Sequence, residues 1–332
     1  MLSVRSPRRR PVPVLLGVLV TLAVAAALLW QPLFPRDERP SGSVTLSTGV
    51  TTGVYARYGQ LLRGQLAHDA PGLDMTLTPS VGSVENIRRL VDGEADFAIA
   101  TADSIAAYRA GGGEGADRLR ACARLYDDYL QLVVPAGSPV RTTAELAGLR
   151  VGVGQDGSGV QLVTRELLGA AGLDMDRDVT AFRQGINDMP RMLEAGRLDA
   201  FFWSGGLPTS AVTRLASRLD IRLVPLGDLL PALALRGPHS EFYRAAVMPP
   251  DAYPAIAGSD VVDTIAVANL LVTTESSDDA ITEQITRSVI NGRDQIGQEV
   301  HAAQRVDLRT AIYTRPLQLH PGARDYYRSV KS

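Results

Sequence analysis

The chain contains little cysteine and little histidine, and both shortages exclude whole classes of site. Cys122 is the only cysteine among 332 residues, so no disulfide can form within the chain and no zinc or iron–sulfur centre can be built on several thiolates. We expect Cys122 to be a plain core residue. The four histidines are His68, His239, His301 and His320. None of them has a second metal-ligating residue beside it at the spacing of a metal site. No cofactor or metal is therefore expected.

The sequence also lacks the short motifs of many enzymes and nucleotide-binding proteins. Residues 49–53 lack the Lys-Ser/Thr of a P-loop, and no Gly-x-Ser-x-Gly is present. No motif in the sequence therefore identifies a catalytic nucleophile with its base. The alternative is a catalytic serine and histidine that are brought together only by folding. We do not expect an enzyme.

Outside the amino terminus the chain has no excess of positive charge. Residues 1–40 hold six arginines against Asp37 and Glu38, while the whole chain carries a net charge of −2, so the body is more acidic than this total. A mildly acidic body releases few counterions from a phosphate backbone, and nucleic acid is not an expected partner. A composition of 45% hydrophobic and 21% charged residues is that of a globular protein.

The amino terminus has the layout of an export signal. Four arginines precede the apolar run of residues 14–30, and no charge lies within residues 11–35. This pattern predicts a single transmembrane helix in residues 1–40 that anchors the chain in the lipid membrane, with a short linker behind it and the body on the extracytoplasmic side. Alternatively, the small residues within residues 23–27 permit cleavage, which would leave a secreted or periplasmic protein.

The body reads as two successive alternations of strands and helices, separated by the breaker cluster Pro135-Ala-Gly-Ser-Pro139. We expect an α/β fold with two lobes and a central ligand cleft: residues 43–135 plus 227–332 form lobe 1, and residues 136–226 form lobe 2. The hinges are expected near residues 134–138 and 224–228. Residues 130–134 and 261–273 are predicted strands, and residues 277–300 a predicted helix.

Three loops rich in glycine and hydroxyl groups follow predicted strands and open predicted helices, which is where open α/β sheets bind ligands. Their unpaired backbone NH groups and hydroxyls predict an anion site. The alternative is that they are turns and helix caps. The candidate ligand-binding residues are Thr48, Gly49, Thr51, Thr52 and Gly53 in the first loop, Ser80, Gly82 and Ser83 in the second, and Gly157, Ser158 and Gly159 in the third.

Aromatic residues and one arginine extend this candidate site. Trp203 ends an apolar run and is followed by glycines, so its ring is a candidate to cover the ligand while Gly205 allows close backbone approach. Tyr55 and Tyr126 lie near predicted element ends. Arg183 follows a predicted strand and is a candidate partner for a carboxylate. Core packing for Trp203 and plain solvent exposure for Arg183 are the alternatives.

Several motifs, in this order and spacing, resemble the TAXI family of TRAP-transporter solute receptors over residues 43–328. They are Thr48-Gly-Val-Thr-Thr-Gly-Val-Tyr55, Gly82-Ser-Val-Glu-Asn-Ile87, Gly93-Glu-Ala-Asp96, Val151-Gly-Val-Gly154 with Gly157-Ser-Gly159, Asp199-Ala-Phe-Phe-Trp-Ser-Gly-Gly-Leu-Pro208, and Leu319-His-Pro-Gly-Ala323. The resemblance implies a type II periplasmic-binding-protein fold, a small anionic ligand such as glutamate, glutamine or a dicarboxylate, and a TRAP-type membrane permease driven by an ion gradient.

Two segments depart from the family pattern near the expected cleft. Thr101-Ala102-Asp103 stands where the family often has Gln-x-Asp, and Tyr126-Asp127-Asp128 stands where Tyr-Pro-Glu is frequent. Thr101 and Asp103 are therefore added to the candidate ligand-binding residues. The departures bear on the identity of the ligand more than on the fold. The predicted function is an extracytoplasmic solute receptor, and the alternative is a sensory receptor that signals through a membrane partner.

Overall fold

The computed structural model describes residues 40–256 and 261–331. The predicted amino-terminal helix lies outside these residues. Within the described ranges, no helix is long and apolar enough to cross a membrane.

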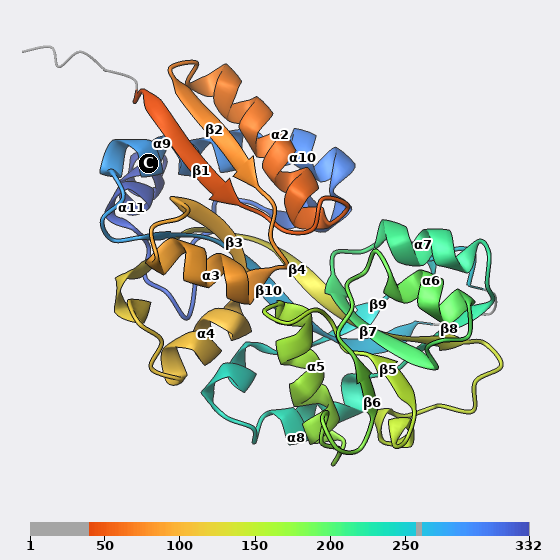
Figure 1. Cartoon of the computed structure of the whole chain (residues 1–332). Helices are drawn as coiled ribbons and strands as arrows, with labels where there is room; N and C mark the ends of the chain where they lie inside the picture. The colour runs from red at the N-terminus through yellow and green to blue at the C-terminus, as the bar shows by residue number, and fades with distance from the viewer. Residues whose placement is uncertain (1–39, 257–260, 332) are drawn as a thin grey trace, which may run out of the picture. The chain divides into compact units, whose positions relative to one another are not determined.

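One sheet of ten strands runs through the described chain (Figure 1). Its strand order is β2-β1-β3-β10-β4-β7-β5-β6, while β8 pairs with β4 and β9 pairs with β10. The strands are β1 Gly42–Ser47, β2 Leu73–Thr78, β3 Phe97–Thr101, β4 Leu119–Pro135, β5 Arg150–Gly152, β6 Thr180–Phe182, β7 Ala200–Gly205, β8 Ile221–Val224, β9 Arg244–Met248 and β10 Val262–Thr274. The outer strands β1, β2 and β3 pair in parallel, as do β5, β6 and β7.

Helices connect these parallel strands, because a parallel pair needs a crossover. The described helices are α2 Val54–Asp69, α3 Ser83–Val91, α4 Ala102–Ala110, α5 Gly159–Ala170, α6 Met189–Glu194, α7 Ser210–Ala216, α8 Leu230–Leu233, α9 Asp279–Asn291, α10 Arg293–Glu299 and α11 Pro321–Ser329. Of these, α2, α3, α5 and α6 make the parallel connections. Short 3₁₀ turns include η2 Thr143–Leu146, η4 Pro238–Phe242 and η6 His301–Arg305. The single helix predicted over residues 277–300 is divided at Gly292 into α9 and α10.

Two long antiparallel strands pass from one half of the sheet to the other. The amino-terminal part of β4 and the carboxyl-terminal part of β10 pair with each other beside β3, whereas residues 129–135 of β4 pair with β7 and β8. The sequence predicts this strand only over residues 130–134, with a hinge at residues 134–138. In the structure β4 already begins at Leu119, and its residues 129–135 pair with β7 and β8. The lobe boundaries themselves stay predictions.

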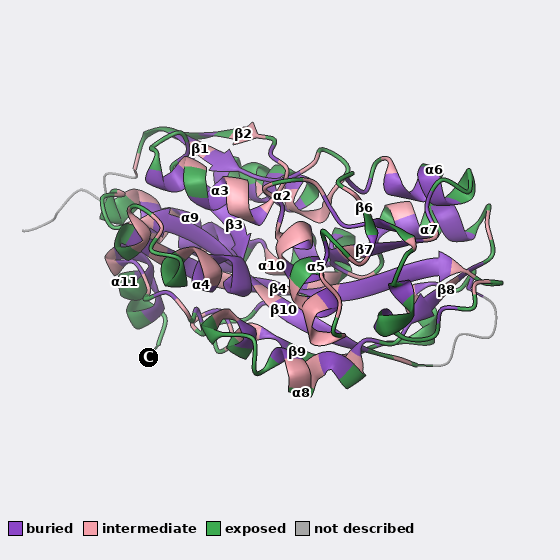
Figure 2. Cartoon of the chain, turned by 60° about the horizontal axis from the view of Figure 1, so that its bottom comes forward, coloured by how far each residue is buried: buried purple, intermediate pink, exposed green. Residues whose placement is uncertain are grey.

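Buried side chains form separate cores on both faces of each half (Figure 2). In the first half, α2 and α9 cover one face and α3 and α4 the other. In the second half, α5 and η2 cover one face and α6 and α7 the other. Coverage on both faces explains why central strands read as continuous apolar runs. Phe201 and Phe202 in β7 are both buried and belong to opposite cores.

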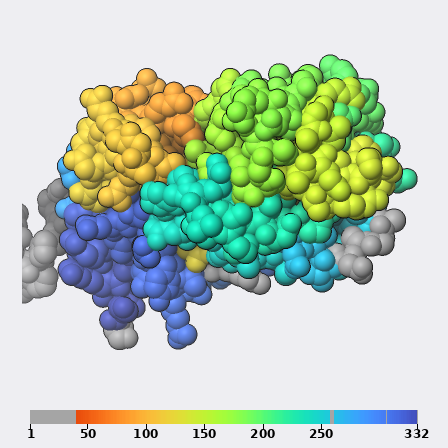
Figure 3. All heavy atoms as spheres, turned by 90° about the horizontal axis from the view of Figure 1, so that it is seen from below, coloured from red at the N-terminus to blue at the C-terminus, as the bar shows by residue number. Residues whose placement is uncertain are grey.

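One segment after β8 returns along both halves. In Figure 3 the residues around η4 lie against α4 on one side and the α5 region on the other. The Tyr243 hydroxyl donates to Asp103 Oδ2 at 2.8 Å, and Arg236 Nε donates to Glu166 Oε2 at 2.7 Å. This segment is therefore bonded to both α4 and α5.

Candidate functional site

A small cavity of about 60 Å³ lies where the two halves of the sheet meet. The first half contributes residues of the loops before α2 and α3, including Gly49, Gly53, Gly82 and Ser83, together with Thr101 and Tyr55. The second half contributes the start of α5 at Gly159 and Val160, and the end of β7 at Trp203, Ser204 and Gly205. Asp128 of β4 lines the cavity between them. A space of this size holds more than one water molecule.

The amino-terminal ends of α3 and α5 face each other across this cavity. A Cβ atom built on Gly82 would lie 3.7 Å from the backbone nitrogen of Gly159, and one built on Gly159 would lie 3.2 Å from Ser83 Oγ. Gly82 also has a φ of 134°, where side chains are rarely found. The backbone conformation therefore favours glycine at position 82, and the close contact with Ser83 favours it at position 159.

Four backbone NH groups at these helix ends have no hydrogen-bond partner within the described part of the chain: those of Ser83, Val84, Gly159 and Val160. The next NH groups are used, because Glu85 N donates to Gly157 O and Gln161 N donates to Ser158 Oγ. Unpaired NH groups at a helix start favour a negative charge, as does the helix dipole. The two helix ends therefore make one side of the cavity electropositive.

Several predicted hydroxyl ligands have structural roles instead. Ser158 Oγ donates to Gln155 O at 2.6 Å and accepts from Gln161 N, which makes Ser158 the cap of α5. Ser80 Oγ donates to Thr48 O at 3.0 Å, and Thr48 Oγ1 to Thr78 O at 3.3 Å. The side chains of Ser158, Ser80 and Thr48 thus act in turns and helix caps. Other residues of the same loops line the cavity.

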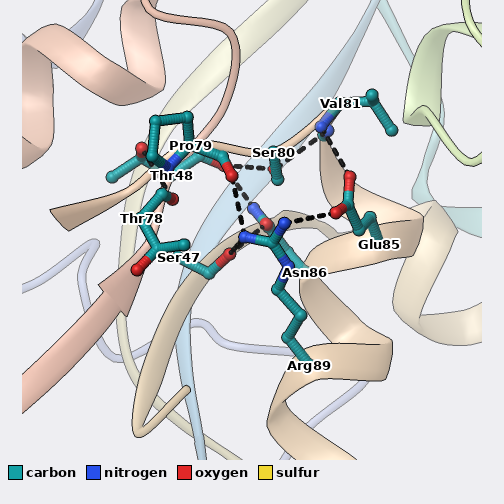
Figure 4. Close-up of polar contacts among 10 residues, drawn as sticks. Ser47, Thr48, Thr78, Pro79, Ser80, Val81, Glu85, Asn86 and Arg89 are labelled. Atoms are coloured by element: carbon teal, nitrogen blue, oxygen red, sulfur yellow. Dashed lines mark hydrogen bonds and ion pairs between the residues drawn. The ribbon is translucent and has the colours of Figure 1, made fainter. Parts of the chain in front are cut away.

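Asn86 of α3 ties the two first-half loops to the sheet (Figure 4). Its Nδ2 donates to Thr48 O at 2.5 Å and to Ile99 O at 2.7 Å, and its Oδ1 accepts from Ser47 Oγ at 2.7 Å. Arg89 supports the same region by donating to Pro79 O at 2.8 Å. These bonds connect both loops to α3 and to the sheet.

A chain of hydrogen bonds runs along the cavity from one half to the other. Ser83 Oγ lies 3.1 Å from the Tyr55 hydroxyl, and that hydroxyl donates to Asn269 Oδ1. Asn269 Nδ2 donates to Asp128 Oδ1 at 2.8 Å, and Ser204 Oγ donates to Asp128 Oδ2 at 3.3 Å. Asn269 reaches this position at a register shift between β10 and β4, where residues 268 and 270 pair out of step.

Asp128 is a buried carboxyl group in this chain. Burial raises its pKa to about 7, against hydrogen bonds from Asn269 and Ser204 that lower it, and the nearby charges of Asp103 and Asp127 raise it further. Its exposed fraction is 4%. A strongly perturbed carboxyl in a cavity is a candidate functional group.

Trp203 lines the cavity as expected and is half-buried. Its Nε1 points at Gly205, where an added Cβ would lie 2.5 Å away, and the buried Nε1–H has no partner among the described residues. Gly205 was predicted to allow close approach of the backbone to a ligand. In the structure the indole of Trp203 occupies the space where a Cβ atom of residue 205 would lie.

The structure places the remaining predicted residues away from the cavity lining. Arg183 is exposed and pairs with Asp176 at 2.6 Å and Asp156 at 3.3 Å, so its charge is already compensated. Asp103 is buried and accepts from Tyr243. Tyr126 lines a second cavity of about 520 Å³ on the other face of β4, with Arg124, Asp127 and Arg244. Thr51 and Thr52 are exposed at the loop tip, and Gly157 accepts from α3 through its carbonyl.

Three polar residues of the site were not predicted from the sequence: Asp128, Asn269 and Ser204. The apolar lining residues Val50, Val54, Val81 and Val160 were not predicted either. Asp128 was noticed only as part of a departure from a family pattern. Asn269 carried no signal, because it lies within an apolar strand.

A family model described as the NMT1-like family matches residues 46–330. The chain belongs to the NMT1-like family. This match is coarser than the TAXI resemblance, which stays a prediction.

Solved structures share the fold of this NMT1-like chain at low sequence identity. A protein described as an L-cystine ABC transporter from Listeria monocytogenes aligns with a TM-score of 0.51 and 15% identity over 79% of this chain and 97% of that chain. A protein of Bordetella bronchiseptica RB50 aligns with a TM-score of 0.50 and 17% identity over 84% of this chain and 83% of that chain. These matches support an α/β fold like that of periplasmic binding proteins.

The buried Asp128 predicts a pH dependence of stability in the empty protein. Because its folded pKa lies above that of an ordinary carboxyl, the folded state holds the proton more tightly, and stability falls as the pH rises from about 4 to about 7. Asp128→Asn removes this slope. Denaturant unfolding of both proteins should show the variant gaining about 3 kcal/mol on the wild type between about pH 4.5 and pH 8.

The matched control is Asp127→Asn, which makes the same charge change at the neighbouring residue, where Arg124 and Arg244 are ion-pair partners. This variant should keep the fall in stability between about pH 4.5 and pH 8 that Asp128 causes. Parallel profiles for wild type and Asp128→Asn would contradict the assignment.

Proposed function

We propose that this NMT1-like chain is an extracytoplasmic solute receptor, not an enzyme, which binds a small solute through an anionic group and delivers it to a membrane permease. The observation that carries the proposal is the pair of helix ends, α3 and α5, that come from opposite halves of the sheet and present four unpaired NH groups to one cavity. An anion there gains from both helix dipoles, and closure around it excludes water.

The composition of the cavity also supports binding over catalysis. Its lining combines glycine backbone, apolar side chains and a few polar groups, as small-solute pockets do. Among the described residues, no histidine, cysteine or lysine lines it. The export pattern of residues 1–40 supports a location outside the cytoplasm, tethered by a single helix.

A charge placed at the helix ends tests the anion proposal. Val81 lines the cavity just before α3, so Val81→Asp introduces a carboxylate where the solute's anionic group would lie. Coulomb repulsion at short range should weaken binding at least about 10-fold. The probes are L-alanine, L-glutamate, taurine and their deaminated counterparts, measured by titration calorimetry.

Val81→Asn is the matched control, because it has nearly the same size and polarity without the charge. Its affinity should lie much closer to that of the wild type. Equal affinities for the Asp and Asn variants would show that no anionic group lies at these helix ends.

We further infer that the permease is of the ion-gradient-driven TRAP type, which rests on the motif resemblance alone. Uptake of the bound solute by cells carrying the chain and its permease should stop when a protonophore or sodium replacement collapses the gradient, and should continue in vanadate. Inhibition by vanadate with the gradient intact would assign the chain to an ATP-driven transporter.

A further inference from the structure

Asp128 is a buried acid whose charge has no cationic partner. Its two carboxylate oxygens accept hydrogen bonds from Asn269 and Ser204, and both donors are neutral. Within residues 40–256 and 261–331, no arginine, lysine or histidine lies within ion-pair distance of it. Burying an ionised carboxylate without a counter-charge is costly.

The neighbouring residue shows that the chain supplies cations readily on the other face of β4. Asp127 pairs with Arg124 at 2.7 Å and also with Arg244. Successive side chains of a strand point to opposite faces, and the two aspartates accordingly line different cavities. Arginine is thus present on the face of Asp127 and absent on the face of Asp128, where the solute cavity lies.

The surroundings of Asp128 add to the negative character of this end of the cavity. Asp103 is buried nearby and is bonded to a neutral donor, Tyr243. The ring of Trp203 lines the same cavity, and aromatic faces attract cations. No group of three or more metal-ligating side chains occurs in the part of the chain that the structure describes, so a bound metal ion is not favoured as the counter-charge.

The cavity therefore has two unlike ends. The NH groups of α3 and α5 attract negative charge, and Asp128 with Trp203 attracts positive charge. Only Tyr55 and Asn269 separate Ser83 from Asp128 in the hydrogen-bond chain, so one small molecule can reach both ends.

We propose that Asp128 is the specificity-determining acceptor of a protonated amino group on the solute, and that the receptor therefore takes a zwitterion with an anionic and an ammonium group. This inference rests on the proposed receptor function. It separates the ligand classes left open by the sequence, because a dicarboxylate would place its second negative charge near the Asp128 carboxylate.

Matched pairs that differ only in the amino group test this directly. The pairs are L-alanine and propionate, L-glutamate and glutarate, and taurine and ethanesulfonate, titrated into the full-length chain by calorimetry. For the pair that binds, the wild type should prefer the amino member at least about 10-fold, since a hydrogen bond to a charged group contributes this much. Asp128→Asn should lose at least about 10-fold for the amino member and bind the deaminated member as well as or better than the wild type does.

Asp127→Asn is the control for a lost negative charge, and it should keep the wild-type preference. Equal binding of both members by the wild type, with no change in Asp128→Asn, would overturn the inference and leave the receptor function standing, with Asp128 as a structural acid. Binding of no member of any pair would overturn both. If Asp128→Asn fails to fold, the wild-type preference within the pair still decides, because it needs no variant.

Discussion

The antiparallel pairing of β4 with β10 is the constraint on which the rest of the structure depends. These are the two strands long enough to belong to both halves of the sheet, and they carry the parallel strands of each half on either side. The middle of each strand therefore lies between two hydrophobic cores. Asp128 and Asn269 occupy these middle positions. They form a hydrogen-bonded polar pair at the junction, and neither residue belongs to a hydrophobic core.

The same junction explains the electrostatic asymmetry of the cavity. Parallel strands on both sides end at it, so the helices that follow them begin there and turn their unpaired NH groups inward. The long strands contribute the opposite sign through Asp128. Tyr55 and Asn269 link the two ends by hydrogen bonds. Under the proposed function, such a site would select solutes by the arrangement of two charges more than by size.

Local patterns in the sequence predicted the parts of the site that are built locally. A strand, a glycine loop and a helix start follow one another along the chain, so Gly82, Ser83 and Gly159 could be recognised, and these residues line the cavity. The same patterns could not tell backbone roles from hydroxyl roles. Ser158 is a helix cap by its hydroxyl, which is what serine does at most helix starts.

Non-local features were beyond sequence reasoning. Adjacent acids at positions 127 and 128 have no periodicity that reveals which one faces the cavity, because that depends on the strand register. The register shift beside Asn269 is set by pairing with a strand about 140 residues away in sequence. Arg183 shows the same dependence on non-local contacts. Its position after a predicted strand does not reveal that Asp156 and Asp176 are its ion-pair partners.

The central claim is that one solute is held at once by the helix ends and by the junction of β4 with β7. An amide NMR titration of the isotope-labelled chain with the solute that binds most tightly tests this most directly. We predict that the NH signals of Ser83, Val84, Gly159 and Val160 and the indole signal of Trp203 shift together along a single binding curve. Shifts confined to the second cavity, around Arg124, His301 and Gln304, with the helix ends unmoved, would contradict the account.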